Sequence, residues 1–545
     1  MSHGLARWVA FVAVVAGIAG LYAASPSAAQ DAPARGKDPL LPADADDVST
    51  GFAGCSACHN ERAPLDVKGN QFAKKHKSHQ FVLLSEGRTW NQEDPHSKAH
   101  DVLTRALGKQ MSAILKYDVT KAGQCLTCHA IDITPSAPLE KKQFETAEGI
   151  TCNACHGLRK PWQQEHYAEK AKQIPWRTMT PEKKEGYGMR NLRDPVVRAT
   201  LCTSCHVGSA AEDKVVTHEM YAAGHPPLPP FELGTFMESE PKHWGYPTDP
   251  ALKFFQPDEF ETYAGKDFVQ AHPNWTWDLY RFHPADKEVY LARSVVAGAV
   301  ASLRAEMRMI AADAGAAAKN PQADGVDYAR FDCYACHHDL RVPSARQKRG
   351  YDGGKPGRPP LKAWVAALPG VVAEHAVGLA PLADTAQLFP AKWAAVRAAA
   401  LSRPFGDPKA LSAAAGDMAA WCDDFLAKSG ADGKPLYTKA QAASLLAAVG
   451  AAATSDKWTA DPEAAMHLTW AYLALKGAAD GRPVAGAALD ALGATIPVRV
   501  RRPPFSDDNG DPKPAGVEIG PRLKLFREYE ADKFIGQFKA LTGGK

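Results

Sequence analysis

Apolar residues recur every three or four positions over long stretches of the chain, which is the spacing of one helix face. The clearest stretch is 284–318, where Pro284 opens the pattern and Gly315 weakens its end. Strand signals are few along the whole sequence. The pattern therefore predicts a mainly α-helical protein with one long helix over 284–318.

Two more helices are predicted in the last hundred residues. In the stretch 461–479, Asp461 stands at the N-cap position, Pro462 lies in the first turn and Gly477 lies near the end. The stretch 520–541 repeats the apolar spacing of a helix. We therefore expect the C-terminal part of the chain to be helical throughout.

The first 29 residues have the pattern of an export signal. Arg7 supplies a positive charge, residues 8–24 form an apolar stretch, and small residues up to Ala29 offer a cleavage site. An uncleaved membrane anchor is the alternative, since an apolar stretch of 17 residues is at the lower limit of a membrane span. Because the small residues follow directly, we expect cleavage and a mature protein without a stable membrane span.

Composition divides the remaining chain. Alanine dominates the last third, whereas proline, histidine, tryptophan and cysteine are concentrated before it. We predict a polar leader over 30–50, a Cys/His-rich domain of short helices and loops over 51–348, and an Ala-rich helical domain over 361–545. The Gly/Pro/basic segment 349–360 would be the linker, and 501–516 a loop within the last domain.

The balance of charge gives no reason to expect a nucleic-acid partner. The formal net charge is +3, and the basic segment 74–79 is too short to form an extended binding patch. We interpret that segment as a solvated loop.

Ten of the eleven cysteines form five C-x-x-C-H units, which is far more than chance would give. Two cysteines separated by two residues lie about one helical turn apart, so both can bond one edge of a porphyrin, and the following histidine can ligate the iron. Zinc sites or disulfides are the alternatives, but neither needs a histidine after every second cysteine. We therefore predict five covalently attached haem c groups, bound by Cys55, Cys58, Cys125, Cys128, Cys152, Cys155, Cys202, Cys205, Cys333 and Cys336 and ligated by His59, His129, His156, His206 and His337.

Five haems change the expected location and partners. Covalent haem attachment takes place outside the bacterial cytoplasm, which agrees with the export signal and indicates the periplasm. With two propionates on each haem, the holoprotein would carry a charge of about −3 when oxidised and about −8 when reduced. We therefore expect redox partner proteins with basic docking surfaces. The remaining Cys422 lies in the Ala-rich region and is expected to be a buried, inert thiol.

Low-spin haem iron needs a sixth ligand, and histidine is the usual one in multihaem proteins. We predict distal ligands among His96, His166, His218 and His225. His96 and His100 lie one turn apart and could face one ring, whereas His218 and His225 are close to the same helical angle. His338 adjoins the ligand His337 and is expected to be structural, as are His375 and His467 in the tail. The other histidines outside the motifs, any of which could serve, are His76, His79, His243, His272 and His283.

Four of the motifs, in order, resemble the cytochrome c554 family of multihaem electron carriers. The resemblance covers roughly residues 51–230 and is most specific at "EGITCNACHG", where His166 follows ten residues after His156. It implies that His166 ligates the haem of His59, that His96 ligates the haem of His156, and that His218 or His225 ligates the haem of His206. It also implies a second haem, at His129, without a distal protein ligand. The fifth motif and the long tail depart from the family pattern.

Two functions remain open from the sequence. The first is a periplasmic pentahaem cytochrome that relays electrons between proteins through bis-histidine haems. The second is an oxidoreductase that acts on a small nitrogen or sulfur compound at one open haem, as in the related hydroxylamine oxidoreductase family. The absence of a C-x-x-C-K unit argues against a pentahaem nitrite reductase. Only 22 residues separate His129 from Cys152, and this close spacing of the second and third motifs predicts that their rings are neighbours.

Overall fold

The computed structural model describes residues 51–60, 86–131, 146–166, 176, 181–241, 289–320, 325–351, 354–430, 435–498 and 519–543. The predicted signal, the polar leader and the predicted loop 501–516 lie outside these ranges. So do the side chain of Cys58 and five of the spare histidines, namely His76, His79, His243, His272 and His283.

The prediction of a mainly α-helical fold is confirmed. The structure is 68% helical and contains no strand in the described part of the chain, where extended pairing is limited to two isolated bridges. Up to residue 241 the helices are short: α2 (Phe52–His59), α4 (Glu86–Glu93), η3 (Pro95–Lys98), α5 (Asp101–Thr104), α6 (Ala106–Leu115), α7 (Gly123–His129), η4 (Thr146–Glu148), α8 (Cys152–His156), α9 (Lys160–Glu165), α10 (Pro181–Gly186), α11 (Pro195–His206), η6 (Ala210–Glu212), α12 (His218–Ala223) and α13 (Leu233–Ser239).

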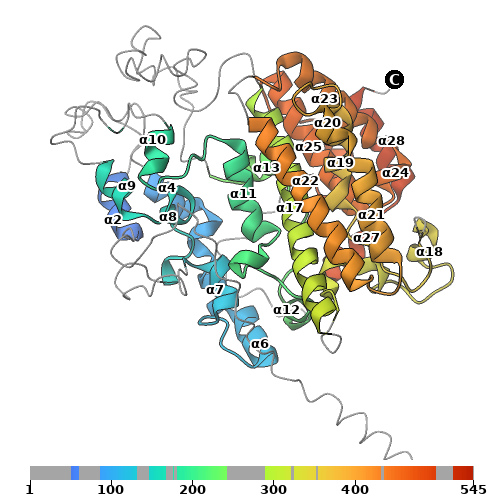
Figure 1. Ribbon diagram of the computed structural model, residues 1–545, viewed down its shortest axis with the longest axis horizontal. Coiled ribbons are helices and arrows are strands. Elements are labelled where there is room, and N and C mark those ends of the chain that lie inside the picture. The colour runs from blue at the N-terminus through green and yellow to red at the C-terminus, as the bar shows by residue number, and fades with distance from the viewer. Residues whose placement is uncertain are drawn as a thin grey trace, which may run out of the picture. The chain divides into compact units, whose positions relative to one another are not determined.

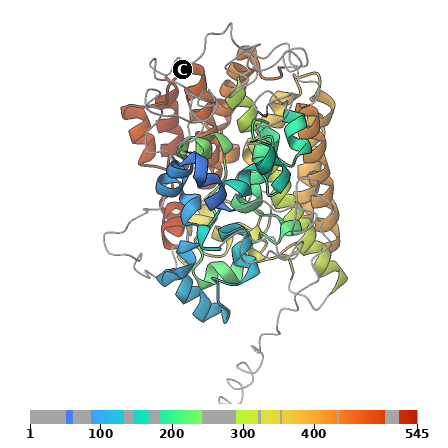
Figure 2. The ribbon, with the colours of Figure 1, turned by 90° about the vertical axis from the view of Figure 1, so that its left-hand side faces the viewer.

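After residue 288 the helices are longer and form a bundle. They are α17 (Tyr290–Lys319), η9 (Tyr328–Arg330), η10 (Cys333–Ala335), α18 (Ala345–Arg349), α19 (Trp364–Ala376), α20 (Ala383–Gln387), α21 (Phe389–Leu401), α22 (Pro408–Gly430), α23 (Lys439–Ala452), α24 (Asp456–Thr459), α25 (Pro462–Asp480), α26 (Ala487–Gly493), α27 (Ile519–Glu528) and α28 (Ala531–Thr542). Figures 1 and 2 show the short helices, coloured blue to green, on one side of α17 and α22.

The helix that begins at Pro462 follows its predicted capping. The Asp461 carboxylate accepts hydrogen bonds from the backbone N–H groups of Glu463 and Ala464, which satisfies two donors that the first turn leaves free. The helix ends at Asp480, one residue beyond the predicted stretch, because Gly481 takes a left-handed φ of 66° and its N–H donates to the Gly477 carbonyl.

The predicted helix over 520–541 is two helices, α27 and α28. Glu530 is extended between them, with φ of −122° and ψ of 106°. On one side of this break the Phe526 ring stacks on Tyr334, at 4.8 Å between ring centres. On the other side Phe534 and Phe538 are fully buried. The two halves thus bury apolar residues in different contacts, which one straight helix face would not reach.

The long helix α17 lies at the centre of the main hydrophobic core. It packs against α22, α19 and α25 of the C-terminal bundle and against α11, which carries the fourth attachment motif. Residues Lys37–Lys545 form one compact unit. The packing therefore crosses the linker predicted at 349–360, and α17 shares its core with the Ala-rich region that follows that segment.

One buried histidine of the bundle joins segments that precede and follow the predicted linker. His467 is fully buried, with Nε2 3.0 Å from the Phe231 carbonyl and Nδ1 3.2 Å from the Trp364 carbonyl. Its imidazole therefore bridges α25 to both sides of the predicted linker.

Cys422 is fully buried in the core, as expected, and this burial raises the pKa of its thiol.

In the described part of the chain, no helix is both long enough and apolar enough to cross a bilayer.

We predict that Leu303→Ala in α17 lowers the free energy of unfolding by about 2–5 kcal/mol, because it leaves a cavity in a fully buried position. Loss of helical circular dichroism in denaturant measures this change. Leu388→Ala is the matched control, since Leu388 is 52% exposed and its truncation should cost less than about 1 kcal/mol. Equal effects of the two substitutions would contradict the central position of α17.

Candidate haem sites

Four of the five C-x-x-C-H motifs end an α-helix, with the histidine as its last helical residue. These helices are α2, α7, α8 and α11, and the fifth motif begins at the single turn η10. Helical geometry places the two cysteines of a motif about one turn apart. At the N-cap of η10, Asp332 accepts a backbone N–H and fixes where the fifth motif begins, and Asp194 does the same at the start of α11, the helix that ends with the fourth motif.

Four motif histidines face a second imidazole from another part of the chain. Two of the pairs have nearly parallel rings and two have nearly perpendicular rings. The ring centres are 6.3 Å apart at 27° for His59 and His166, 6.1 Å at 25° for His337 and His218, 6.3 Å at 78° for His129 and His225, and 6.2 Å at 85° for His206 and His96.

This separation fits a metal ion between the two rings. A transition metal lies about 2 Å from an imidazole nitrogen that ligates it, and the ring centre lies about 1 Å farther away. Two imidazoles on opposite sides of one iron therefore have ring centres about 6 Å apart. Four pairs at 6.1–6.3 Å match that value, so the side chains present fit bis-histidine haem.

Hydrogen bonds to the other ring nitrogen support the same assignment. A metal-bound histidine usually donates its second ring N–H to a carbonyl or a carboxylate, which fixes the ring orientation. Five of the paired imidazoles have such an acceptor at Nδ1, which leaves Nε2 for the metal. The acceptors are Glu86 for His59 at 3.1 Å, Asp94 for His96 at 2.8 Å, and the carbonyls of Ala99 for His129 at 2.6 Å, of Gln163 for His166 at 2.5 Å and of Pro226 for His225 at 2.8 Å.

Electrostatics differ among these imidazoles. Burial lowers the pKa of His206 and of His225 to about 4, so both rings are neutral, as a metal ligand must be. Burial also opposes protonation of His96, but the hydrogen bond and charge of Asp94 raise the pKa of His96 to about 9. Asp94, His96 and Glu240 gather potential ligand atoms within 4.8 Å. Because the Asp94 carboxylate lies on Nδ1 of His96, we interpret it as the group that orients this ring.

Contacts between attachment cysteines show which motifs adjoin. Cys55 Sγ lies 3.9 Å from Asn153 Oδ1, within the third motif. Interaction with Cys152 lowers the pKa of Cys55, and interaction with Cys205 raises the pKa of Cys128. The first motif thus adjoins the third, and the second adjoins the fourth. These contacts do not test the prediction that the second and third rings are neighbours, which rests on their close spacing in sequence and stays a prediction.

His218 and His225 serve two different motifs. Helix α12 begins at His218 and ends at Ala223, where Gly224 takes a φ of 124°. The chain therefore turns before His225, and the two rings do not share a helix face. His218 faces the fifth motif and His225 faces the second. The resemblance assigned one of them to His206 and left the second haem without a ligand, and the structure differs on both points.

His96 also differs from its expected place. The resemblance pairs His96 with His156, whereas the structure places it against His206. Its neighbour His100 does not face the same ring, because His100 Nε2 lies 3.5 Å from the Thr120 carbonyl. His166 lies against His59, as the resemblance implies. His338 turns to its neighbour, with Nδ1 2.8 Å from the Asp339 carbonyl.

The third motif is positioned by a glycine and a tryptophan. The Trp162 ring lies 6.4 Å from the His156 ring, and its Nε1 donates to the Gly157 carbonyl. Gly157 has a φ of 122°, and a Cβ there would lie 2.2 Å from the Gly188 carbonyl oxygen, so this position requires glycine. The described residues do not assign a distal histidine to this motif.

Comparison with known proteins gives one match. Residues 54–157, which contain the first three attachment motifs, match the family model described as cytochrome c554 and c-prime. No curated protein and no solved structure matches the chain. The helix-terminal C-x-x-C-H motifs and the opposed imidazoles agree with this match, so the segment 54–157 is similar to the cytochrome c554 family of c-type cytochromes.

Proposed function

We propose that the chain is a periplasmic pentahaem c-type cytochrome that relays electrons between redox proteins. The observation that carries the proposal is the set of four opposed imidazole pairs at iron-ligating separation. Haem iron supplies reversible one-electron chemistry at each site. The paired histidines would ligate that iron from both faces of the haem, so they would determine the spin state of the iron and whether other ligands can bind to it.

Adjacent motifs support a relay. Cys55 of the first motif contacts Asn153 of the third, and Thr127 of the second motif donates a hydrogen bond to the Asp213 carbonyl in the turn that follows the fourth. The short segment 218–225 also connects the fifth motif with the second, because His218 at its start faces His337 and His225 at its end faces His129. Sites that share contacts or a ligating segment lie close together, and this is what electron transfer within one protein needs.

Chemistry on a small nitrogen or sulfur compound is the less supported alternative. An enzyme needs an iron with an open position, and the resemblance placed that position at the second haem. In the structure His225 faces His129 there, with 6.3 Å between ring centres. At that haem a substrate would therefore have to displace an imidazole, and we assign no catalytic residue.

Partners follow from charge. The formal charge of +3 falls to +2 when the predicted signal with Arg7 is removed, and five oxidised haems at about −1 each bring it to about −3. We propose redox partners with basic docking surfaces, which such a charge would attract over long range.

We predict five haems on each mature chain. Acid acetone should leave the colour on the protein, because thioether bonds survive a treatment that extracts free haem. Intact mass spectrometry counts the groups. A substitution of both cysteines in the fifth motif, Cys333→Ser with Cys336→Ser, should remove one haem and leave four. A wild-type mass with fewer than five haems would contradict the assignment of all five motifs.

We predict that His218→Ala and His225→Ala open different haems. Near-parallel and near-perpendicular imidazole planes give different low-spin ferric signals in electron paramagnetic resonance. His218→Ala should convert one haem of the near-parallel class to high spin, and His225→Ala one of the near-perpendicular class.

His100→Ala is the matched control for these two variants, since Nε2 of this ring lies 3.5 Å from the Thr120 carbonyl. Its ferric spectrum should equal that of the wild-type protein. If neither His218→Ala nor His225→Ala yields a high-spin signal, the two histidines are not distal ligands.

A further inference from the structure

A tight turn follows the fourth attachment motif and also contacts the second. The Ser209 N–H donates to the Lys214 carbonyl at 2.8 Å, and the Lys214 N–H donates to the Ser209 carbonyl at 3.0 Å. Asp213 takes a left-handed φ of 55° inside this turn. The Thr127 hydroxyl, which belongs to the second motif, donates to the Asp213 carbonyl at 3.2 Å. The turn is therefore fixed to both motifs.

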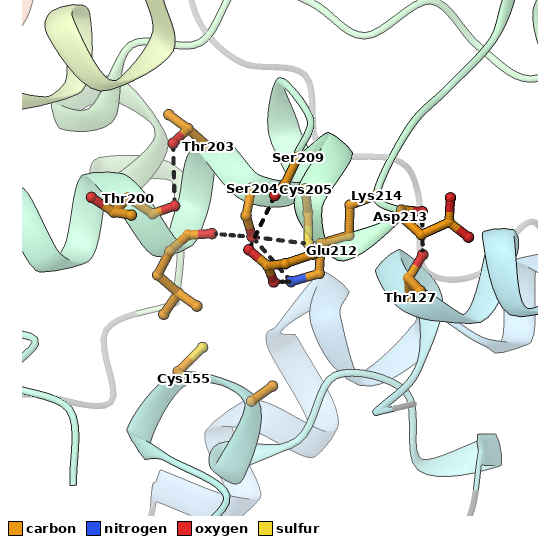
Figure 3. A network of polar contacts seen from close by, with 12 residues as sticks. Thr127, Cys155, Thr200, Thr203, Ser204, Cys205, Ser209, Glu212, Asp213 and Lys214 are labelled. Atoms are coloured by element: carbon orange, nitrogen blue, oxygen red, sulfur yellow. Dashed lines mark hydrogen bonds and ion pairs between the residues drawn. The ribbon is translucent and has the colours of Figure 1, made fainter. Parts of the chain in front are cut away.

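The turn holds one lysine side chain among the motif residues (Figure 3). The Lys214 Nζ donates to Glu212 Oε2 at 2.7 Å and to the Ser204 hydroxyl, within the fourth motif, at 3.1 Å. The Lys214 side chain is 17% exposed, whereas that of Glu212 is 46% exposed. Solvent therefore screens the carboxylate more than the ammonium.

The Lys214 ammonium also interacts with the attachment sulfurs of both motifs. Its charge acts on Cys205 of the fourth motif and on Cys128 of the second, and these two side chains contact each other. In the holoprotein the two sulfurs are uncharged thioethers. No thiolate then balances the ammonium, and its field acts on the two porphyrins that the sulfurs hold.

We propose that the positive charge of Lys214 raises the reduction potential of the haems attached at Cys205 and Cys128. This inference rests on the proposed electron relay. Reduction adds one negative charge to a haem, and a weakly screened cation beside it stabilises that charge. Electrons that enter the protein are thereby held preferentially at the second and fourth haems.

The test is a redox titration of the intact holoprotein, followed by electron paramagnetic resonance. His129–His225 and His206–His96 are the two near-perpendicular pairs, so their haems are distinguished from the near-parallel class. Lys214→Met should lower the midpoint potential of the near-perpendicular class and leave the near-parallel class unchanged. Lys214→Arg, which keeps the charge, should restore the wild-type potential. Glu212→Gln, which removes the opposing carboxylate, should shift the same haems to higher potential.

Lys121→Met is the matched control. Lys121 lies two residues before α7, the helix of the second motif, but its side chain is 83% exposed and paired with Asp118. Its removal should leave all potentials unchanged at physiological ionic strength, because solvent and salt screen its charge.

Haem content and ferric spin state of each variant separate this inference from the function on which it rests. If the wild-type protein lacks haem at the second or fourth motif, the proposed relay fails. If Lys214→Met loads five low-spin haems and its potentials equal those of the wild type, the role of Lys214 is overturned. If Lys214→Met does not fold, Glu212→Gln decides, and the absence of an upward shift in that variant overturns the role equally.

Discussion

The opposition of two imidazoles across about 6 Å is the constraint on which the rest of the structure depends. One imidazole of each pair is fixed by a local motif at a helix end, whereas the other comes from a distant segment. His166 reaches the first motif from the end of α9, and His96 reaches the fourth from η3. With iron bound between its rings, each pair would crosslink two segments, in addition to the small apolar core that the short helices form around Leu103, Met111 and Val119.

The helical bundle supplies the rigidity that the short helices lack. Helix α17 packs along α11, which ends at the fourth motif, and it buries its other faces against α19, α22 and α25. The Phe231 ring, fully buried, stacks on His206 at 5.5 Å between ring centres, and its carbonyl lies 3.0 Å from Nε2 of His467 in α25. The bundle is thus continuous with one haem site, and it holds that imidazole in place.

Hydrogen bonding and charge around the imidazoles favour electron transfer over substrate chemistry. Acceptors at Nδ1 orient five of the rings, so displacement of a ligand would cost both a metal bond and a positioned ring. The pairs also divide into near-parallel and near-perpendicular classes. Because the four paired sites offer the same two ligands, we expect differences in reduction potential among them to come from ring orientation and from nearby charges.

The sequence by itself determined the helical fold, the cap at Asp461 and the five attachment motifs, because helix capping and thioether attachment depend on residues within a few positions of one another. It also indicated that histidines outside the motifs face iron. Only the tertiary structure decided their partners. His218 and His225 are seven residues apart, yet the turn at Gly224 sends them to different motifs, and His96 meets a histidine 110 positions away. Which histidines form a pair depends on how distant segments pack against each other, and this cannot be predicted from the residues near each histidine.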